Sequence, residues 1–451
     1  MPGRLSVFDR AELATDVGPS PRNVAVLFVL AGPAPDAALL RARMARAVAR
    51  EPRLAEHVRR RRVAGPVWEA RPVGLSHHVR VRSAPGADPV AVAVEELLRP
   101  MPSGHPPWRL TVVDLADDER SALVWSSAHV LGNGPSILRL LLDHLADPSA
   151  ATAGTWRSAG RRPLPAGDLD ESAPGSVRTA HLRRRLLVRP GRSPLVRPVT
   201  AGLTAVPVST DLDALRAGAH ACGATVNDAL LWAWGCAFRH AEAMRGGAAG
   251  RAVISVPVTV PGAGFGNEVG SLRVPVTDQA GSPRAQLAAF AADTRRIKRR
   301  VRPWTWPVAA SGAVLVGGFR LLPSMLRRQR LISTVATYAP GPPEPLRVLG
   351  TPVVATVPLV PVVGNVTALV AATSLGGRLD AAVVCSPESA DLAPSLADDL
   401  AARLRDIASL GRGRPPSPRP TDPPPTVAAC PPRTPAAREG AECIVLSQLE
   451  Q

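Results

Sequence analysis

The stretch from Trp125 to Ser136 reads Trp-Ser-Ser-Ala-His-Val-Leu-Gly-Asn-Gly-Pro-Ser, and the rest of the chain is best understood outward from it. The apolar residues at its start, Leu123 to Trp125, predict a buried strand. The Asn-Gly-Pro cluster that follows ends the strand and favours the start of a helix, because proline is tolerated in the first turn. His129 is therefore expected where a strand ends, so that a sheet holds the side chain rigidly while it faces a cavity.

His129 has two interpretations on these residues alone. A histidine at the end of a strand suits a general base, because the pKa of its imidazole lies near neutral pH. A lone histidine is more often a structural side chain that is hydrogen-bonded within the fold. Both interpretations stay open until the surrounding sequence is considered.

Length and composition predict a two-lobed globular protein. The chain has 451 residues, of which 45% are hydrophobic but only 3% aromatic, so its cores are expected to consist of Val, Leu and Ala. The formal net charge is +17, which favours an anionic partner such as coenzyme A, an acidic lipid surface or nucleic acid. A GC-rich genome would also produce this excess of arginine. Because no zinc-finger spacing or aromatic stacking platform accompanies the charge, we expect no nucleic-acid binding.

The cysteines and the first residues predict a cytoplasmic protein. The five cysteines form no CxxC pair and no metal-binding spacing, which is typical of reduced thiols, so no metal site is expected. The first ten residues contain no apolar run long enough for a secretory signal.

Residues 1–150 are predicted to form a first lobe of mixed α/β structure that carries His129 on its inner edge. The pair His77 and His78 is expected to consist of structural or surface histidines, because the residues after it alternate like a half-exposed strand. Apolar periodicity predicts strands and amphipathic helices over Asn23–Ala31, Asp36–Arg50, Val90–Leu98, Trp108–Leu115 and Ile137–Leu145.

Residues 151–198 are polar and rich in Arg and Pro, which predicts a crossover between lobes. Residues 199–411 are predicted to form a second α/β lobe, and the Pro-rich residues 412–451 a disordered tail. The elements expected in the second lobe are Leu203–Val208, Ala229–Met244, Val253–Val260, Leu272–Val276, Arg284–Arg300, Val353–Val357, Val366–Thr373, Leu379–Val384 and Leu392–Leu410.

The stretch from Ala128 to Gly134 resembles the His-His-x-x-x-Asp-Gly signature of the coenzyme-A-dependent acyltransferase and condensation-domain superfamily. His129 matches the second histidine of the signature, which in that superfamily takes a proton from the acceptor hydroxyl or amine. The first histidine is replaced by Ala128 and the aspartate by Asn133, so a structural ion pair of the family is lost.

A second resemblance is to the bacterial bifunctional wax ester synthase/diacylglycerol acyltransferase family. Thr225-Val226-Asn227-Asp228, followed by an apolar helix, resembles its Val-Asn-Asp element, although Asn227 and Asp228 also fit a simple helix cap. Across roughly residues 9–410, further blocks follow the family's order: Trp68 with His78-Val79-Arg80, Pro100 to Trp108, Ser255-Val256-Pro257-Val258, Gly266-Asn267-Glu268-Val269 and Pro340 to Leu346.

This resemblance implies two similar mixed-sheet lobes with a channel between them and the motif histidine at its centre. It implies that His129 is the base and that Asn227 hydrogen-bonds near the developing oxyanion or the base. Asp16 occupies the place of an N-terminal family glutamate and is a further candidate. The residues expected to support the motif are Asn133, Gly134 and Asp228.

The function expected from the resemblance is transfer of a fatty acyl group from acyl-coenzyme A to diacylglycerol or a long-chain alcohol, with acyl-coenzyme A as substrate and no cofactor. Two alternatives stay open: an impaired relative that binds lipid or partners, and a condensation-type enzyme of natural-product assembly. The uncharged segment Pro303–Phe319, flanked by arginines, predicts either a helix on an anionic membrane surface or a core helix with basic ends. We therefore expect attachment to the inner face of the plasma membrane or to lipid bodies.

Overall fold

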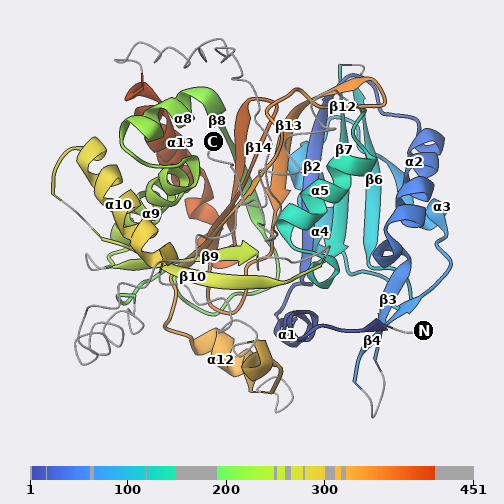
Figure 1. Cartoon of the computed structure of the whole chain (residues 1–451), viewed down its shortest axis with the longest axis horizontal. Helices are drawn as coiled ribbons and strands as arrows, with labels where there is room; N and C mark the ends of the chain where they lie inside the picture. The colour runs from blue at the N-terminus through green and yellow to red at the C-terminus, as the bar shows by residue number, and fades with distance from the viewer. Residues whose placement is uncertain are drawn as a thin grey trace, which may run out of the picture. The chain divides into compact units, whose positions relative to one another are not determined.

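The computed structural model describes residues 3–16, 18–60, 65–117, 119–148, 190–247, 251–259, 266–277, 280–299, 310–315 and 321–411. Most of the expected crossover, the whole expected tail and most of Pro303–Phe319 lie outside these ranges. Two six-stranded mixed sheets and a small three-stranded sheet make up the described strands, with helices packed on the large sheets (Figure 1).

The first large sheet is organised around β2 (Asn23–Ala31) and β7 (Arg120–Ala128), which pair antiparallel along their whole length. Its strand order is β12-β13-β2-β7-β6-β5, and β5 and β6 are its parallel pair. The remaining strands of this sheet are β5 (Val79–Ser83), β6 (Trp108–Asp117), β12 (Arg347–Val348) and β13 (Thr351–Leu359).

Both faces of β2 are buried, which explains its nearly continuous apolar sequence. Because successive side chains of a strand point to opposite faces, Phe28 and Leu30 enter one core while Ala25 and Leu27 enter another. The first core packs against α2 (Ala37–Arg50) and α5 (Gly134–His144), and the second against α4 (Pro89–Leu98).

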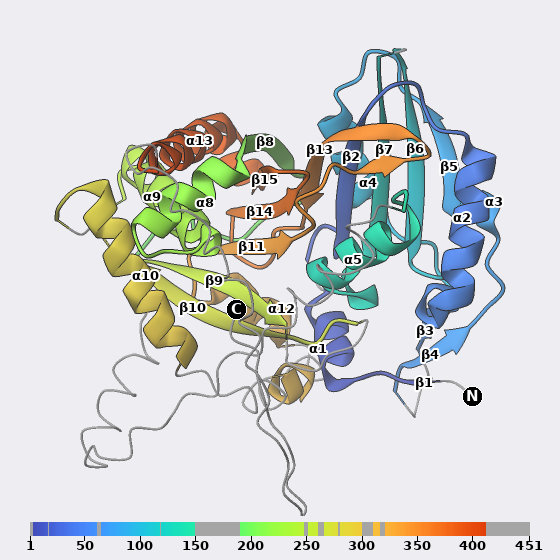
Figure 2. The same cartoon turned by 45° about the horizontal axis from the view of Figure 1, so that its top comes forward.

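The second large sheet has the order β10-β9-β11-β14-β15-β8. Its strands are β8 (Thr204–Asp211), β9 (Ala252–Thr259), β10 (Val269–Val276), β11 (Thr334–Pro340), β14 (Ala368–Leu375) and β15 (Arg378–Cys385). A core on one of its faces is closed by α8 (Leu212–Ala221), α9 (Val226–Met244), α10 (Pro283–Arg299) and α13 (Ala393–Ser409), as Figure 2 shows from a second direction. Gly218 of α8 touches α13 so closely that an added β-carbon would lie 1.8 Å from the Ile407 carbonyl oxygen.

The position of β13 corrects the predicted lobe boundaries. Val353–Val357 forms a strand as expected, but its assignment to the second lobe is wrong, because β13 pairs with β2 in the first sheet. Apolar alternation predicts a strand without identifying its partner. Val357 and Leu359 of β13 share a core with α4 and with Leu369 of the second sheet, so this strand lies where the two sheets meet.

The third sheet anchors the N-terminal helix. Its order is β1-β4-β3, from β1 (Gly3–Arg4), β4 (Val67–Ala70) and β3 (Glu56–Arg59), and β3 directly follows the short helix η1 (Pro52–Ala55). The indole Nε1 of Trp68 in β4 donates a hydrogen bond of 3.2 Å to Asp9 in α1 (Val7–Thr15). The packing of α1 is therefore fixed by residues far along the chain.

Two predictions about individual segments can be compared with the structure. The structural interpretation of His78 is confirmed: its buried Nδ1 lies 2.7 Å from the Trp108 carbonyl oxygen, in the short helix α3 (Leu75–His78). Within the described parts of the chain, no helix has both the length and the apolar character needed to cross a bilayer.

Candidate active site

His129 directly follows the strand β7, and backbone hydrogen bonds fix its position. The backbone N–H of Ala128 donates to the Pro107 carbonyl (2.9 Å), and the N–H of His129 donates to the Arg22 carbonyl (2.7 Å). His129 begins the short helix η2 (His129–Leu131), after which Asn133 caps α5. The end of the strand is therefore held on both sides, as expected from the sequence.

A carboxylate faces the imidazole ring. Oε1 of Glu12, in α1, lies 3.7 Å from Nδ1 of His129, and both side chains are mostly buried. Arg22 holds the carboxylate in place, because its Nε donates a 2.7 Å hydrogen bond to the same Oε1. Glu12, Arg22 and His129 thus form a charged cluster at the end of β7.

Burial and the neighbouring charges set the proton affinities in this cluster. Burial lowers the pKa of His129, Glu12 raises it, Arg22 lowers it, and the net direction is downward. Burial by itself would raise the pKa of Glu12, but Arg22, His129 and a hydrogen bond from Asn267 lower it and prevail. The imidazole is therefore neutral near pH 7 and able to accept a proton, beside an ionised carboxylate.

Residues of the C-terminal half reach the same cluster. The backbone N–H of Asn133 donates to the Gly266 carbonyl (3.0 Å), and the side chain of Asn267 is hydrogen-bonded to Glu12. Three buried atoms here have no hydrogen-bond partner in the described structure: His129 Nδ1, Asn133 Nδ2 and Asn267 Oδ1. Unpaired buried polar atoms are costly, so their concentration in one cluster is typical of a site that receives a polar ligand.

The motif residues have separate structural roles. Asn133 is the N-cap of α5, and its Oδ1 accepts a hydrogen bond of 2.9 Å from the Ser136 N–H. Apart from its chain neighbours and the backbone of its own helix, no described atom would lie within 4 Å of a β-carbon added at Gly134. Asn133 therefore acts as a helix cap, and Gly134 adds no side chain at the start of α5.

Of the other predicted residues, Asp16 hydrogen-bonds to a member of this cluster, whereas no hydrogen bond of the described structure joins Asp228 or Asn227 to it. Asp228 closes a capping box with Thr225 and accepts a hydrogen bond of 2.7 Å from Thr294, which supports its interpretation as a helix cap. Asn227 lies half-buried in the first turn of α9, and no hydrogen bond joins its side chain to His129. Asp16 follows α1, where its Oδ1 accepts a hydrogen bond of 3.3 Å from the Arg22 N–H.

Sequence reasoning therefore missed Glu12, Arg22 and Asn267. Glu12 lies one helical turn before the predicted candidate Asp16, and Asn267 lies within the block Gly266-Asn267-Glu268-Val269. The periodicity of α1 was the available signal, but it does not say which side of the helix meets His129.

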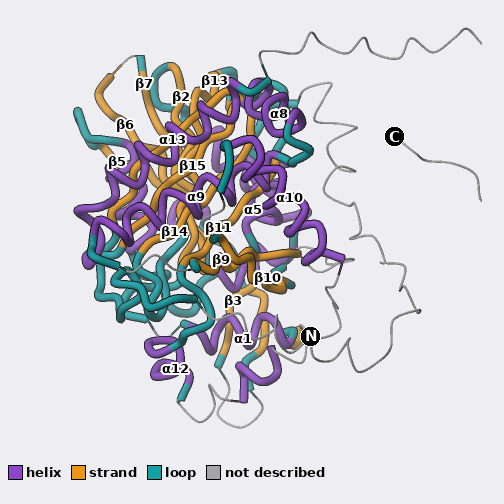
Figure 3. Tube along the Cα trace, turned by 90° about the vertical axis from the view of Figure 1, so that its left-hand side faces the viewer, coloured by secondary structure: helices purple, strands orange, loops and turns teal. Residues whose placement is uncertain are grey.

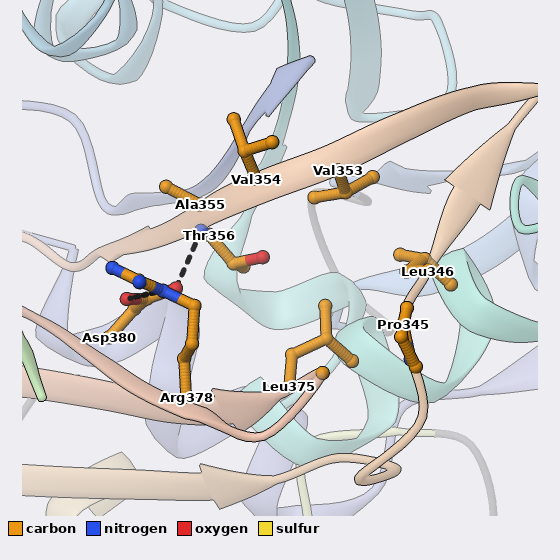
Figure 4. A pocket seen from close by; sticks show the side chains of 10 residues that line it. Pro345, Leu346, Val353, Val354, Ala355, Thr356, Leu375, Arg378 and Asp380 are labelled. Carbon is orange, nitrogen blue, oxygen red and sulfur yellow. Dashed lines mark hydrogen bonds and ion pairs between the residues drawn. The ribbon is translucent and has the colours of Figure 1, made fainter. Parts of the chain in front are cut away.

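A cavity of about 50 Å³ lies elsewhere, between β13 and the β14–β15 hairpin (Figure 4). Asp380 borders it, accepting a hydrogen bond of 2.9 Å from the Thr356 N–H and pairing with Arg378 at 3.4 Å. None of the residues around His129 lines this cavity, and its volume is too small for an acyl chain. Within the described ranges, no group of three His, Cys, Asp or Glu side chains is arranged to hold a metal ion.

Solved structures of known proteins share the fold of this chain. Solved structures with the same fold include the wax ester synthase/diacylglycerol acyltransferase of Marinobacter aquaeolei VT8, at a TM-score of 0.63 and 18% identity, covering 90% of this chain and 100% of that one. They also include the starter condensation domain of the rhizomide synthetase RzmA with C8-CoA, at a TM-score of 0.60 and 16% identity, covering 91% and 95%.

Sequence relatives include proteins of Mycobacterium bovis and Mycobacterium tuberculosis that are named as candidate diacylglycerol O-acyltransferases. Each is 26% identical over 315 residues, which cover 60% of this chain and 62% of the relative's length. Residues 5–175 match the catalytic-domain profile of the wax ester synthase/diacylglycerol acyltransferase family, and residues 265–408 match its C-terminal domain profile. With both profiles in order along one chain of the same fold, this protein belongs to the wax ester synthase/diacylglycerol acyltransferase family.

Proposed function

We propose that this protein transfers a fatty acyl group from acyl-coenzyme A to the hydroxyl of diacylglycerol or of a long-chain alcohol. The observation that carries the proposal is the position of His129: a mostly buried imidazole at the motif position, held at the end of β7 beside the Glu12 carboxylate, with a pKa that burial lowers. That is the arrangement a general base requires, because the ring accepts a proton and the carboxylate stabilises the cation that results.

In the proposed reaction His129 takes the hydroxyl proton as the alcohol oxygen attacks the thioester carbonyl. The tetrahedral intermediate collapses with loss of the coenzyme A thiolate, and the imidazolium returns the proton to that sulfur, so no covalent enzyme intermediate and no cofactor is needed. Glu12 stabilises the imidazolium between these steps, since it is the negative charge nearest Nδ1 in the described cluster. Asn227 is assigned to the developing oxyanion on family resemblance alone.

The proposed partners are acyl-coenzyme A, a lipid alcohol and an anionic membrane surface, reached from the cytoplasm at the inner face of the plasma membrane or at lipid bodies. The support for an anionic partner is the net charge of +17. Support for a lipid acceptor comes from the names of the Mycobacterium relatives.

The test is thiol release from long-chain acyl-coenzyme A by the full chain, with and without dioleoylglycerol or hexadecanol. We expect release that depends on the alcohol, and a fall in kcat of about 10²- to 10⁴-fold in His129→Ala, the usual contribution of a positioned base. Release that ignores the alcohol, or none with either alcohol, would contradict the proposal and favour the impaired relative that binds lipid or partners.

Condensation chemistry on a carrier-protein thioester is the second candidate, because a starter condensation domain has the same fold. The same assay distinguishes it when acyl-coenzyme A is replaced by an acylated carrier protein and the alcohol by an amine. Turnover with the carrier alone would replace the lipid proposal.

A further inference from the structure

Exposed apolar side chains are concentrated in one short part of the chain. Eight large apolar side chains of the described residues are exposed, and four of them lie between residues 315 and 331. Leu321, Met325 and Leu331 are 56%, 54% and 52% exposed. Single exposed apolar residues are ordinary, but such a concentration around one helix indicates a contact surface.

Met325 lies on the helix α12 (Leu322–Arg328), and Leu321 and Leu331 lie just before and after it. Leu321 and Met325 are four residues apart and therefore neighbours on the helix surface, whereas Leu322 is buried and faces the protein. The inner side is closely packed, since a β-carbon added at Gly364 would lie 2.6 Å from the Leu326 carbonyl oxygen. The backbone of α12 therefore packs closely against the chain at Gly364.

Basic residues surround this apolar face, and acidic ones are missing from the sequence around it. Residues 294–343 contain ten Lys and Arg and no Asp or Glu. Arg327, Arg328 and Arg330 are exposed, and none of them forms an ion pair within the described part of the chain. The partner of this surface must therefore combine an apolar interior with negative charge.

We propose that the α12 face, defined as Leu321, Met325, Arg327, Arg328, Arg330 and Leu331, docks on a bilayer that contains anionic lipid. A bilayer offers both required features, because its acyl chains accept the Leu and Met side chains while its phosphates accept the arginines. The proposed docking segment is α12, which follows the predicted segment Pro303–Phe319 in the chain.

The position of α12 connects this surface to the candidate site. α12 packs against α1, and the two helices lie side by side in Figures 1 to 3. Glu12 of α1 faces His129, so a bilayer docked on α12 borders the side of the molecule that carries the base. This last step rests on the proposed function: the bilayer would supply the lipid alcohol from the α1 side.

The experiment is sedimentation of the full chain with phosphatidylcholine vesicles in which roughly one lipid in three is phosphatidylglycerol. Leu321→Ser combined with Met325→Ser should weaken binding at least about tenfold, because two half-exposed apolar side chains no longer enter the lipid. Arg327→Gln combined with Arg328→Gln should weaken binding by a similar factor and reduce its dependence on salt.

A matched control is available on α2, where Leu39 is 54% exposed and Arg46 is exposed without a described ion pair. Leu39→Ser combined with Arg46→Gln should bind as the unmodified chain does. Equal binding by the α12 variants, or equal losses in the α2 control, would overturn the proposal, as would undiminished binding to pure phosphatidylcholine.

The mass of the protein in solution tests whether the α12 face joins two copies of the chain instead. If the α12 variants halve that mass while vesicle binding is unchanged, the face joins two copies and the proposal is overturned. Because sedimentation needs no turnover, loss of binding in α12 variants would support the docking surface even if acyl transfer fails. Acyl transfer with unimpaired vesicle binding in these variants would support the enzyme and overturn the surface.

Discussion

Replacing Glu12 by glutamine removes the negative charge beside His129 and keeps the size of the side chain. Oε1 of Glu12 lies 3.7 Å from Nδ1 of His129, a separation too long for a hydrogen bond, so its effect on the ring is mainly electrostatic. The charge acts on the imidazolium, the form that the ring takes when it has accepted a proton. Glu12→Gln should therefore raise the barrier of the proton-transfer step.

The size of the effect follows from the distance and from Arg22. Two unit charges about 4 Å apart attract by about 4 kcal/mol at an effective dielectric constant of about 20, equivalent to roughly a thousandfold in rate. Arg22 binds the same carboxylate oxygen and repels the imidazolium, which cancels part of this attraction. We therefore expect kcat/KM of Glu12→Gln to fall by about ten- to a hundredfold.

The pH dependence of kcat/KM distinguishes an electrostatic role of Glu12 from a merely structural one. Glu12 raises the pKa of His129 against burial and Arg22, so its removal lowers that pKa further. A base with a lower pKa stays unprotonated to lower pH, hence the acid limb of kcat/KM should move down in Glu12→Gln. Arg22→Gln removes a positive charge that lowers this pKa, and the limb should move up.

Initial rates with acyl-coenzyme A and a lipid alcohol, measured across the pH range, provide the test, with thermal unfolding as the control for folding. That control matters for Arg22→Gln, which leaves a buried carboxylate without its partner. Wild-type kcat/KM and an unmoved acid limb in Glu12→Gln, while His129→Ala is inactive, would refute this account of the base.

Three further outcomes concern other residues. Asn133→Asp should keep kcat within about threefold, because aspartate caps a helix as well as asparagine and the Nδ2 atom that it replaces has no partner; a large gain in activity would contradict this. Gly218→Ala should lower the free energy of unfolding, measured by urea titration, by at least about 1 to 3 kcal/mol. The control Gly312→Ala should not lower it, because a β-carbon there meets open space. An unchanged midpoint in Gly218→Ala would refute the close approach of α8 and α13. Burial raises the pKa of Cys385 to about 12, so native protein should leave this thiol unlabelled by maleimide at about pH 8, and rapid labelling would refute its burial.

Local structure was predictable where sequence signals are strong. Asn23–Ala31 is a strand with the expected bounds because nine mostly apolar residues can be buried on both faces. Asp36 caps α2 as expected, whereas the capping box at Thr225 begins α9 at Val226, three residues before the predicted start at Ala229. These signals act within a few residues and need no knowledge of the rest of the fold.

Partners that are distant in the sequence were not predictable. The residue of α1 that meets His129 depends on how α1 packs, and that packing involves the hydrogen bond from Trp68 to Asp9. Asn267 reaches Glu12 from the far half of the chain, through a contact that no local pattern encodes. The His129 strand end was predicted, whereas the charges that set its pKa needed the three-dimensional structure.

The pairing of β13 with β2 in the first sheet affects the order in which the protein can fold during synthesis. Until residue 359 has been made, the apolar strand β2 lacks its partner on one side and presents unpaired backbone groups along an open edge. A fragment that ends near residue 150 would keep that edge permanently, and such edges template aggregation. The nascent N-terminal half therefore has to remain unaggregated while roughly two hundred further residues emerge, a task that takes tens of seconds at about 5 to 20 residues per second and that suits a chaperone.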